Sequence, residues 1–577
     1  MSESSQGTAA PPAGDRSAME FYSQFGEDYL LYSLFRSETD GFYVDIGAFD
    51  GIHISNSYIF EQLGWPGICV EAHPDYFPML QRNRPGATCV SAACVGAGQP
   101  ASVPFLKEEL GLLSGIRADE TADMERRYAL RGMNFTGFET VEVPALTLNE
   151  ILEQHTAGRR RISFVSIDTE GNEPDILRSL DFSAWQIDAF VIEANSDSVR
   201  RELAAFMRAN HYWLARRLNC NLIFVRRLDD ANFLYYRRVD CTIADTLHPK
   251  GEQATPETFR GRRLCDRNSW LTDNVLCQAP DQPLSTLLDY APRAPAARGR
   301  SDFALVHLVN LYSGSSGSKS AQEVVTTSMR EAQAADQESV SLVNVQAETE
   351  TDLTPEGFLR AGNIDRTVMD LASFKRPRPL PLLFDVLERG AELAAPDDFI
   401  IYTNADICLR PYFYRCIRDL IALGFDAITV NRRTVGDRRQ FPESSSLVFA
   451  ETGLDHRGFD CFVFRKSAFD TYVRNHACLG IGDVARGLLY NLVARAKAMV
   501  MLKNVALTYH FGNERSWDLP SLADYTAFNH QEYLRVLDGL AVDKKAMQRL
   551  QAFCRAHREP KPARLYMEKL VAEAGEG

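Results

Sequence analysis

Short apolar runs recur along the first half of the chain, and each is followed by a longer polar or mixed segment. Five of these runs predict buried strands, at residues 42–46, 67–71, 88–95, 164–168 and 189–193. Strands that are apolar along their whole length and joined by long connections are typical of a parallel sheet covered by helices on both faces. The pattern therefore predicts an α/β domain built from successive strand–helix–strand units.

The last two runs of this half are spaced differently. Residues 212–217 and 221–226 are separated only by a short Leu-Asn-Cys segment. Strands joined by so short a turn are antiparallel, because a parallel pair needs a crossover connection of a dozen residues or more. We therefore expect an antiparallel hairpin that closes the otherwise parallel sheet.

A second α/β pattern follows in the other half of the chain. It predicts a helix at residues 321–335 and strands at residues 303–308, 340–345, 399–403, 427–430, 461–464 and 503–509. Between the two patterns, residues 291–300 have the Pro and Ala content of an interdomain linker. We expect a disordered N-terminal segment, a first domain with a C-terminal extension, this linker, a second domain and a helical tail, at residues 1–20, 21–290, 291–300, 301–520 and 521–577.

Charge and cysteine usage restrict the classes of function. The chain of 577 residues has 63 Lys and Arg against 77 Asp and Glu, a formal charge of −14 that would repel a nucleic-acid backbone. Its 12 cysteines have no paired metal-site spacing and are typical of reduced thiols. Residues 1–18 contain no basic segment followed by an apolar stretch, and no later run approaches about 20 apolar residues, so we expect neither a signal peptide nor a membrane span. We therefore predict a cytoplasmic protein without a transmembrane segment or a nucleic-acid partner, and the oligomeric state stays open.

Acids and glycines gather where the first two predicted strands end. The first strand runs into Asp45-Ile-Gly47-Ala-Phe-Asp50-Gly51, and the second ends in Glu71. Glycine after a strand lets the backbone approach a ligand, and an acid at the tip of the next strand can accept hydrogen bonds from ribose hydroxyls. Both NAD and S-adenosylmethionine suit this pattern. A carboxylate at Asp45 would oppose the pyrophosphate of NAD, so charge favours the cationic methyl donor, and a nicotinamide-dependent oxidoreductase is the alternative.

Four segments of the first half occur in an order that carries a family resemblance. Their sequences are SQFGED, VDIGAFDG, CVEAHP and SIDTEGNE, at residues 23–28, 44–51, 69–74 and 166–173. Over residues 21–227 the chain resembles the FkbM family of methyltransferases. The resemblance implies a class I methyltransferase fold with a Rossmann-like sheet, S-adenosylmethionine as cofactor, and O-methylation of a sugar or other secondary-metabolite hydroxyl. It also implies a set of cofactor-binding residues, namely Asp45, Gly47, Asp50, Gly51, Glu71 and Glu170.

Methyl transfer is a displacement at an activated sulfonium, so the protein must chiefly align the acceptor oxygen and help remove its proton. Asp168, at the predicted carboxyl end of a strand, is the preferred base, metal ligand or substrate anchor, and a helix cap is the alternative. Glu193 closes the next strand and His53 follows the glycine turn, so both are further catalytic candidates. A solvated sheet-edge carboxylate and a polar loop histidine are the corresponding structural interpretations. Glu173 is expected to complement the dipole of the following helix.

The second half has an acidic tip of its own. The apolar strand at residues 399–403 ends in Asn404-Ala-Asp406, where a carboxylate can hold a divalent cation against a nucleotide diphosphate. A turn or cap formed by Asp406 is the alternative. With residues 458–465, 480–483 and 510–514, this tip resembles a GT-A glycosyltransferase core over residues 301–517.

The second resemblance implies a nucleotide-sugar donor with Mn²⁺ or Mg²⁺ at Asp406, His510 as a further metal ligand, and Asp483 as the acceptor base. Asn404 stands where the family carries the first Asp of its pair. The sequence thus predicts a bifunctional enzyme of glycan or polysaccharide biosynthesis, with a class I methyltransferase sheet followed by a GT-A-like nucleotide-sugar domain. An O-methyltransferase with a non-catalytic glycan-binding module is the alternative.

Overall fold

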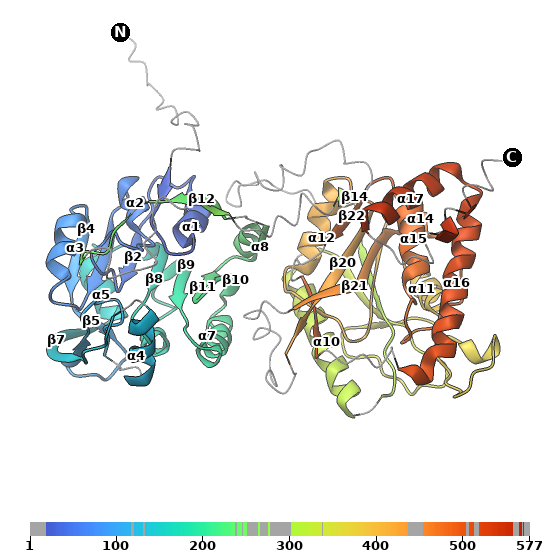
Figure 1. The fold of residues 1–577 in the computed structure, drawn as a ribbon, viewed down its shortest axis with the longest axis horizontal. Helices are drawn as coiled ribbons and strands as arrows, with labels where there is room; N and C mark the ends of the chain where they lie inside the picture. Colours follow the sequence, from blue (N-terminus) through green and yellow to red (C-terminus); the bar gives the residue numbers. More distant parts are fainter. Residues whose placement is uncertain are drawn as a thin grey trace, which may run out of the picture. The chain divides into compact units, whose positions relative to one another are not determined.

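The chain divides into two compact units in a computed structural model (Figure 1). The first comprises Met1–Arg267 with Ala291–Arg293, and the second comprises Asn268–Tyr290 with Ala294–Gly577. The structure describes residues 19–116, 121–130, 133–236, 239–244, 246–250, 263–265, 275–276, 302–314, 316–336, 338–436, 454–502, 507–512, 519–557, 565–567 and 569–570. The expected linker at residues 291–300 lies outside these ranges, as do residues 1–18 of the expected N-terminal segment.

The apolar runs of the first half form a seven-stranded sheet in the order β10-β11-β9-β8-β2-β3-β4. Five of its strands are parallel, namely β2 (Tyr43–Ile46), β3 (Gly67–Glu71), β4 (Ala87–Ser91), β8 (Arg161–Ile167) and β9 (Gln186–Glu193). The side chains of β2 and β3 are buried throughout because helices cover both faces. The predicted parallel sheet is confirmed.

The remaining two strands form the predicted hairpin at the edge of this sheet. β10 (Trp213–Leu218) and β11 (Asn221–Val225) are antiparallel, and β11 is also antiparallel to β9. Asn219 in the turn has a φ of 53°, a left-handed conformation that Asn adopts more readily than most residues.

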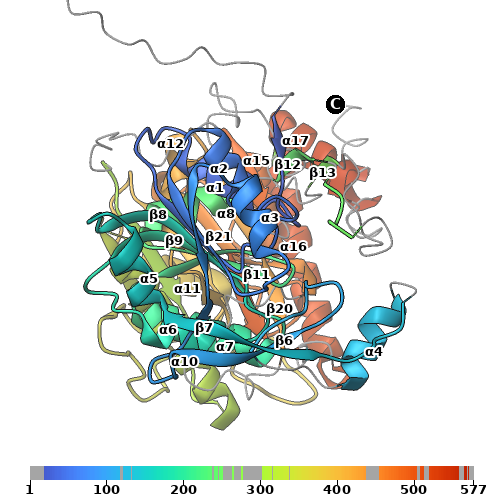
Figure 2. The same ribbon diagram turned by 90° about the vertical axis from the view of Figure 1, so that its left-hand side faces the viewer.

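Helices pack on both faces of the sheet. Helices α5 (Leu148–His155), α6 (Glu173–Ser179) and α7 (Asp197–Ala209) lie on one face (Figure 2). Their apolar side chains are buried in a core shared with β2, β8 and β9. On the other face Phe164 of β8 packs against Phe35 of α1 (Glu27–Phe35) and Phe60 of α2 (Tyr58–Gln62). Helices α3 (Phe77–Asn83) and α8 (Leu228–Tyr236) complete the unit's cover.

Two smaller sheets depart from the expected pattern. The strand expected at residues 88–95 is divided, because β4 ends at Ser91 and Ala93–Val95 forms a separate strand, β5, that pairs with β7 (Glu139–Thr147). β6 (Ser102–Lys107) pairs with β7 as well, and α4 (Thr121–Leu130) follows β6 in the chain. The third sheet contains β1 (Glu20–Phe21), β12 (Asp240–Ile243) and β13 (Arg263–Cys265). Glu20, within the expected N-terminal segment, is therefore part of a strand.

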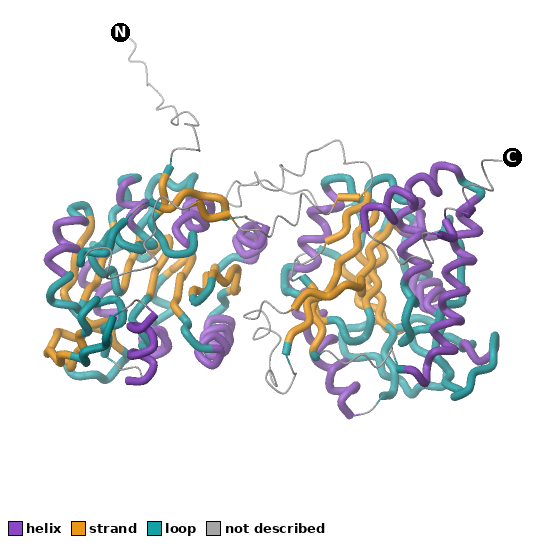
Figure 3. The backbone as a smooth tube through the Cα atoms, in the orientation of Figure 1, coloured by secondary structure: helices purple, strands orange, loops and turns teal. Residues whose placement is uncertain are grey.

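The second unit is built on one mixed sheet, whose strands are drawn in orange in Figure 3. Its central strands are the parallel trio β16 (Val340–Asn344), β15 (Leu305–Val309) and β18 (Phe399–Thr403), followed by β21 (Leu454–Arg465), which is antiparallel to β18 and to β20 (Ala427–Val435). The other strands are β14 (Val275–Leu276), β17 (Leu359–Arg360), β19 (Cys408–Leu409), β22 (Met499–Leu502) and β23 (Thr508–Phe511).

Seven helices of the described residues surround this sheet. They are α10 (Ser316–Ala335), α11 (Leu383–Ala391), α12 (Phe413–Ala422), α14 (Lys466–Phe469), α15 (Arg486–Arg495), α16 (Ala523–Ala541) and α17 (Lys544–His557). The segment expected as a helical tail is helical in α16 and α17, and its buried residues Tyr533, Val536 and Leu550 belong to the core of the second unit. In the part of the chain that the structure describes, no helix combines the length and the apolar character needed to cross a bilayer.

Candidate functional site

A cavity of about 920 Å³ lies at the carboxyl ends of the parallel strands in the first unit. Strands β2, β3, β8 and β9 all end at this cavity. β2 and β8 are neighbours in this sheet. The chain continues from β2 to β3 on one side of this pair and from β8 to β9 on the other side, so the strand order reverses between β2 and β8. Open α/β sheets bind their ligands at this position.

The turn after β2 needs a glycine because two strands approach closely there. Gly47 has a φ of 82°, and its N–H donates to the carbonyl of Val70 at 2.9 Å. A Cβ atom at Gly47 would lie 1.8 Å from the carbonyl oxygen of Asp168. The predicted cofactor glycine therefore lines the cavity and also lets β2 lie against the segment that carries the candidate base.

Glu71 ends β3 and holds the turn after β2 in place. Its Oε2 accepts the N–H of Phe49 at 2.7 Å, and its Oε1 accepts the N–H of His73 at 2.6 Å. Burial raises the pKa of Glu71 to about 7, although these backbone donors act in the opposite direction. Each carboxylate oxygen has a second lone pair, so the group can still accept hydrogen bonds from ribose hydroxyls.

The other predicted residues of this turn have different environments. Asp45 lines the cavity, accepts a 2.5 Å hydrogen bond from Ser57 Oγ, and has a pKa raised by burial. Asp50 accepts the N–H groups of Ile52 and His53 at 2.9 and 2.8 Å, which shapes the turn. The residues that line the cavity include Asp45 and Gly47 but neither Asp50 nor Gly51. Asp50 and Gly51 therefore belong to the turn but do not line the cavity.

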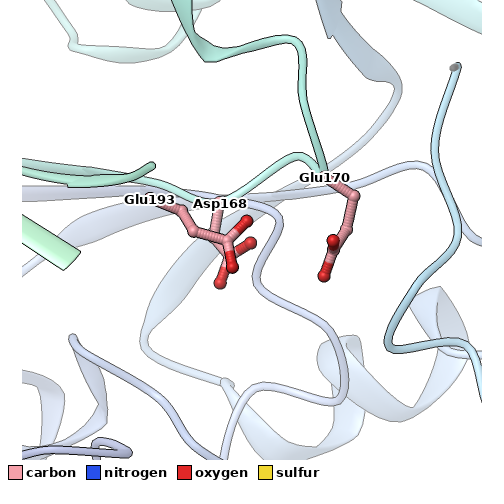
Figure 4. Close-up of side chains that lie close together, drawn as sticks. All are labelled: Asp168, Glu170 and Glu193. Atoms are coloured by element: carbon pink, nitrogen blue, oxygen red, sulfur yellow. The ribbon is translucent and has the colours of Figure 1, made fainter. Parts of the chain in front are cut away.

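Three predicted acids come together in the same cavity. Asp168 follows β8, Glu193 ends the neighbouring strand β9, and Glu170 lies in the turn after Asp168 with a φ of 55°. One carboxylate oxygen of each lies within 4.8 Å of the others. Figure 4 shows the carboxylates of Asp168 and Glu193 side by side, with that of Glu170 on the same side of the chain. Sequence reasoning found all three residues but assigned Glu170 to the cofactor.

Burial dominates the electrostatics of this acidic group. It raises the pKa of Asp168, and the negative charge of Glu173 adds to the effect. It also raises the pKa of Glu193 well above its usual value, with the charge of Asp168 next in size. Glu193 is 8% exposed, and its Oε2 is buried without a hydrogen-bond partner.

The helix after β8 begins beyond Asp168, which decides between two interpretations of that residue. α6 starts at Glu173, and its N-cap residue is Asn172. Asp168 therefore does not cap the helix. Glu173 accepts the N–H groups of Thr169 and Gly171 at 2.9 and 3.1 Å, so its role is to stabilise the turn that carries Asp168 and Glu170.

His53 also reaches the cavity wall, but its environment makes it a weak base. The residue is 2% exposed, and burial lowers its pKa to about 4. Its ring lies 5.7 Å from that of His248, measured between centroids, in T-shaped geometry. His53 is therefore neutral at pH 7, and the carboxylates are the stronger candidates for proton transfer.

Several cavity residues had no sequence signal. Residues 111–116 and Arg217 line the cavity but lie in irregular segments or in the hairpin, where no motif singles them out. The SQFGED motif, in contrast, does supply cavity residues, because Gln24 and Phe25 line the cavity. In the same segment Glu27 accepts a 2.7 Å hydrogen bond from Asn221 Nδ2 of β11, which ties α1 to the sheet.

A second group of polar residues lies at the tip of β18 in the second unit. Asp406 Oδ2 is 3.2 Å from His510 Nε2 of β23, so the two predicted metal ligands are in contact. Although burial opposes it, the hydrogen bond from His510 holds the pKa of Asp406 below its usual range. Asn404 Nδ2 donates to Asp460 Oδ1 at 3.2 Å.

Two carboxylate oxygens in this second group lack hydrogen bonds. Asp406 Oδ1 and Asp460 Oδ2 are buried and have no hydrogen-bond partner, although Arg432 Nε lies 3.5 Å from Asp460 Oδ2. Asp483, the predicted acceptor base, is paired elsewhere. Its carboxylate lies 2.9 Å from Arg486 Nε and 3.7 Å from His530 Nδ1.

Comparisons with solved structures gave distant matches. The METTL16 methyltransferase domain is 9% identical with a TM-score of 0.21, and the match covers 34% of this chain and 66% of that one, which is less than two thirds. The precorrin-6y C5,15-methyltransferase of Geobacter metallireducens is 13% identical with a TM-score of 0.19, over 37% of this chain and 91% of that one. A candidate nucleotide-diphospho-sugar transferase of Desulfovibrio desulfuricans is 16% identical with a TM-score of 0.21, over 42% and 96%.

The search of curated proteins found no match. A family comparison does assign part of the first unit, because residues 45–216 match the methyltransferase FkbM domain. This range begins at Asp45 and includes the cavity residues Gly47, Glu71, Asp168 and Glu193. The first unit therefore contains a methyltransferase domain of the FkbM type, and this family implies S-adenosylmethionine as the methyl donor.

Proposed function

We propose that the first unit methylates a hydroxyl group of a sugar or glycan, with S-adenosylmethionine as donor. The observation that carries this proposal is the cavity of about 920 Å³, which is lined by Gly47 and Glu71 at the ends of β2 and β3 and by Asp168 and Glu193 at the ends of the adjoining strands β8 and β9. A nucleoside-binding half and an acidic half thus share one space within the domain that matches the FkbM family.

The residues present fit the implied cofactor. Glu71 retains lone pairs for the ribose hydroxyls, and Gly47 leaves the backbone open to a close approach. Asp45, Asp168 and Glu193 line the cavity with carboxyl groups, and the ionised forms of these groups attract a cationic ligand and repel a pyrophosphate. When bound, S-adenosylmethionine supplies a methyl group that its sulfonium has already activated.

The acidic half of the cavity has the chemistry to receive the acceptor. Asp168 accepts the hydroxyl proton as the oxygen forms its new bond to the methyl carbon and the carbon–sulfur bond breaks. Its raised pKa brings the carboxyl nearer to neutral pH, where a general base is most effective. Glu193 beside it has a pKa that burial raises well above its usual value, so its carboxyl group can hydrogen-bond to the acceptor and orient it, while His53 is too weak a base to compete.

A direct test is methyl transfer by the purified full chain to a panel of sugars, oligosaccharides and nucleic acids, followed by mass spectrometry. We expect methylated sugar products and unmodified nucleic acid. Methylation of nucleic acid alone would overturn the acceptor class, and a preference for NAD over the methyl donor in a binding titration would favour the oxidoreductase alternative.

We also propose that the second unit transfers a sugar from a nucleotide donor, so that the whole chain is a cytoplasmic enzyme of glycan biosynthesis. The supporting observation is the contact of Asp406 with His510 beside two buried carboxylate oxygens that lack hydrogen bonds. Carboxylate and imidazole groups are ligands for Mn²⁺ and Mg²⁺, and a cation there would neutralise a diphosphate leaving group. Asp483 is the proposed acceptor base.

The competing function for the second unit is glycan binding without catalysis, which Asn404 in place of a second acid permits. Hydrolysis or transfer assays on a panel of nucleoside-diphosphate sugars with Mn²⁺ or Mg²⁺ distinguish the two. Cation-dependent release of the nucleoside diphosphate supports the transferase. Glycan binding without any turnover of the donor supports the binding module.

A further inference from the structure

The acidic group in the first unit has the dimensions of a cation site. One oxygen from each of Asp168, Glu170 and Glu193 lies within 4.8 Å of the others (Figure 4). Oxygen ligands lie roughly 2.0–2.6 Å from a bound Mg²⁺, Mn²⁺ or Ca²⁺, so two ligands of one ion are at most about 5 Å apart. A single ion can therefore touch all three carboxylates.

A second observation is independent of this spacing. Glu193 is 8% exposed, lines the cavity, and has a buried Oε2 atom without a hydrogen-bond partner. A buried polar atom that lacks a partner is costly, and a buried carboxylate oxygen more so. A cation between Glu193 and Asp168 would supply the missing partner.

The surrounding charges act in the same direction. The negative charges of Glu173, Asp45 and Glu27 act on Asp168, whereas Glu193 forms a hydrogen bond with it. The charges that act on Glu193 are those of Asp168, Glu170, Glu173 and the Cys220 thiol. Two adjacent carboxylates in such surroundings, the half-buried Asp168 and the buried Glu193, either share a proton or bind a cation.

We propose that Asp168, Glu170 and Glu193 bind one divalent cation of the Mg²⁺ or Mn²⁺ class. Three carboxylates without a Cys or His ligand select a hard, oxygen-preferring ion. Such an ion keeps open positions, which water fills until an acceptor hydroxyl arrives. This inference rests on the proposed methyl transfer, because it assigns the ion to the acceptor side of that site.

The ion changes how the acceptor loses its proton. A hydroxyl group on the cation is more acidic than a free one, and the oxygen of Asp168 that does not bind the ion accepts the proton. The hydroxyl oxygen then bonds to the methyl carbon as the carbon–sulfur bond breaks, and S-adenosylhomocysteine leaves. Atoms and charge balance without any further reactant.

Binding of Mn²⁺ itself, followed by electron paramagnetic resonance in the absence of donor and acceptor, tests the site. The full chain carrying Asp406→Asn is the background, because the second unit contains a separate candidate site. We expect this protein to bind Mn²⁺, and Glu193→Gln in the same background to weaken binding by at least about 10-fold. Glu153→Gln removes the same charge from an exposed position on α5 and should change nothing.

Two further measurements keep the outcomes distinct. Glu170 lies in a turn outside the core, so its replacement is less disruptive to folding. Glu170→Gln therefore tests the same site if Glu193→Gln fails to fold. Two results would overturn the cation site in favour of a proton shared between the carboxylates. One is the absence of Mn²⁺ binding, and the other is equal Mn²⁺ affinity in Glu193→Gln, Glu170→Gln and the control Glu153→Gln. A parallel titration with S-adenosylhomocysteine distinguishes the cation site from the methyltransferase site. If the protein binds S-adenosylhomocysteine but not Mn²⁺, only the cation site is refuted. If it binds Mn²⁺ but not S-adenosylhomocysteine, the methyltransferase site is contradicted.

Discussion

The backbone at Gly47 lies so close to Asp168 that a Cβ atom at Gly47 would be 1.8 Å from the carbonyl oxygen of Asp168. This contact joins the turn after β2 to the turn after β8, which carry the proposed nucleoside-binding half and the acidic half of the cavity. The geometry of one half therefore depends on the other.

We expect Gly47→Ala to weaken S-adenosylhomocysteine binding and to lower the unfolding temperature of the first unit. Gly64→Ala is a matched control, because Gly64 has a φ of 85° like the 82° of Gly47 but nothing within 4 Å of its added Cβ atom. Both variants carry the left-handed backbone strain of about 1–2 kcal/mol, and only Gly47→Ala adds a steric clash. Calorimetric titration measures the affinity for S-adenosylhomocysteine, and thermal unfolding measures the unfolding temperature. Equal values of both quantities in the two variants would contradict the close contact of Gly47 with Asp168.

Asp168→Asn should leave S-adenosylhomocysteine affinity within about twofold while reducing methyl transfer by roughly 10²-fold or more. The amide keeps the shape of the side chain but can neither accept the proton nor hold a cation as a carboxylate does. Single-turnover kinetics with saturating donor measure the chemical step. Turnover equal to that of the parent protein would reduce Asp168 to a structural residue and make Glu193 the next candidate.

Stability of the first unit should fall as the pH rises. Burial raises the pKa values of Asp28 and Glu71 to about 7, whereas carboxyl groups in an unfolded chain titrate near about 4. Between these values the folded state binds more protons than the unfolded state, so the stabilising effect of these protonated groups is present at about pH 4 and lost by about pH 7.

Differential scanning calorimetry without divalent cations should therefore give a higher unfolding temperature at about pH 5 than at about pH 8. Glu193→Gln removes one carboxyl group whose pKa is raised, so the difference between the two temperatures should shrink. A first unit that is more stable at the higher pH would mean that these acids are ionised in the folded state at neutral pH.

In the second unit, Asp406→Ala should abolish sugar transfer and its dependence on Mn²⁺. Methyl transfer to an acceptor that already carries the sugar should persist, because the methyltransferase cavity is lined by residues of the first unit alone. Asp365→Ala removes an exposed acid of the same unit and should leave both activities unchanged. Sugar transfer that survives Asp406→Ala would remove the proposed metal site and favour a different donor site.

Much of both sheets follows from local patterns. β3 and β18 have the predicted bounds, and the β10–β11 hairpin was predicted from its short turn. These elements are predictable because a fully buried strand needs a run of apolar residues whatever its partners are. The break at Ala92 between β4 and β5 was missed, because the apolar run continues across it and only pairing with β7 divides it.

The candidate site was predictable where a strand end fixes a residue's position. Asp45 lies one residue before the end of β2, and Glu71, Asp168 and Glu193 end or follow the neighbouring parallel strands, so the sheet order alone brings them to one edge. The cavity wall at residues 111–116 comes from a loop without periodicity, and its position depends on tertiary packing. Asp50 shows the limit of motif reasoning. Phe49 lines the cavity, whereas Asp50, the next residue of the same turn, does not, and the motif alone does not distinguish the two positions.

The most direct test of the methyltransferase site is a calorimetric titration of the full chain with S-adenosylhomocysteine, in parallel with NAD. We expect binding of S-adenosylhomocysteine and no detectable binding of NAD. Glu71→Gln should weaken that binding by about 1–3 kcal/mol through loss of charge-assisted hydrogen bonds, and Glu153→Gln should not change it. Absence of S-adenosylhomocysteine binding at millimolar concentration, or equal affinity in the Glu71→Gln and Glu153→Gln proteins, would contradict the assignment of this cavity to the methyl donor.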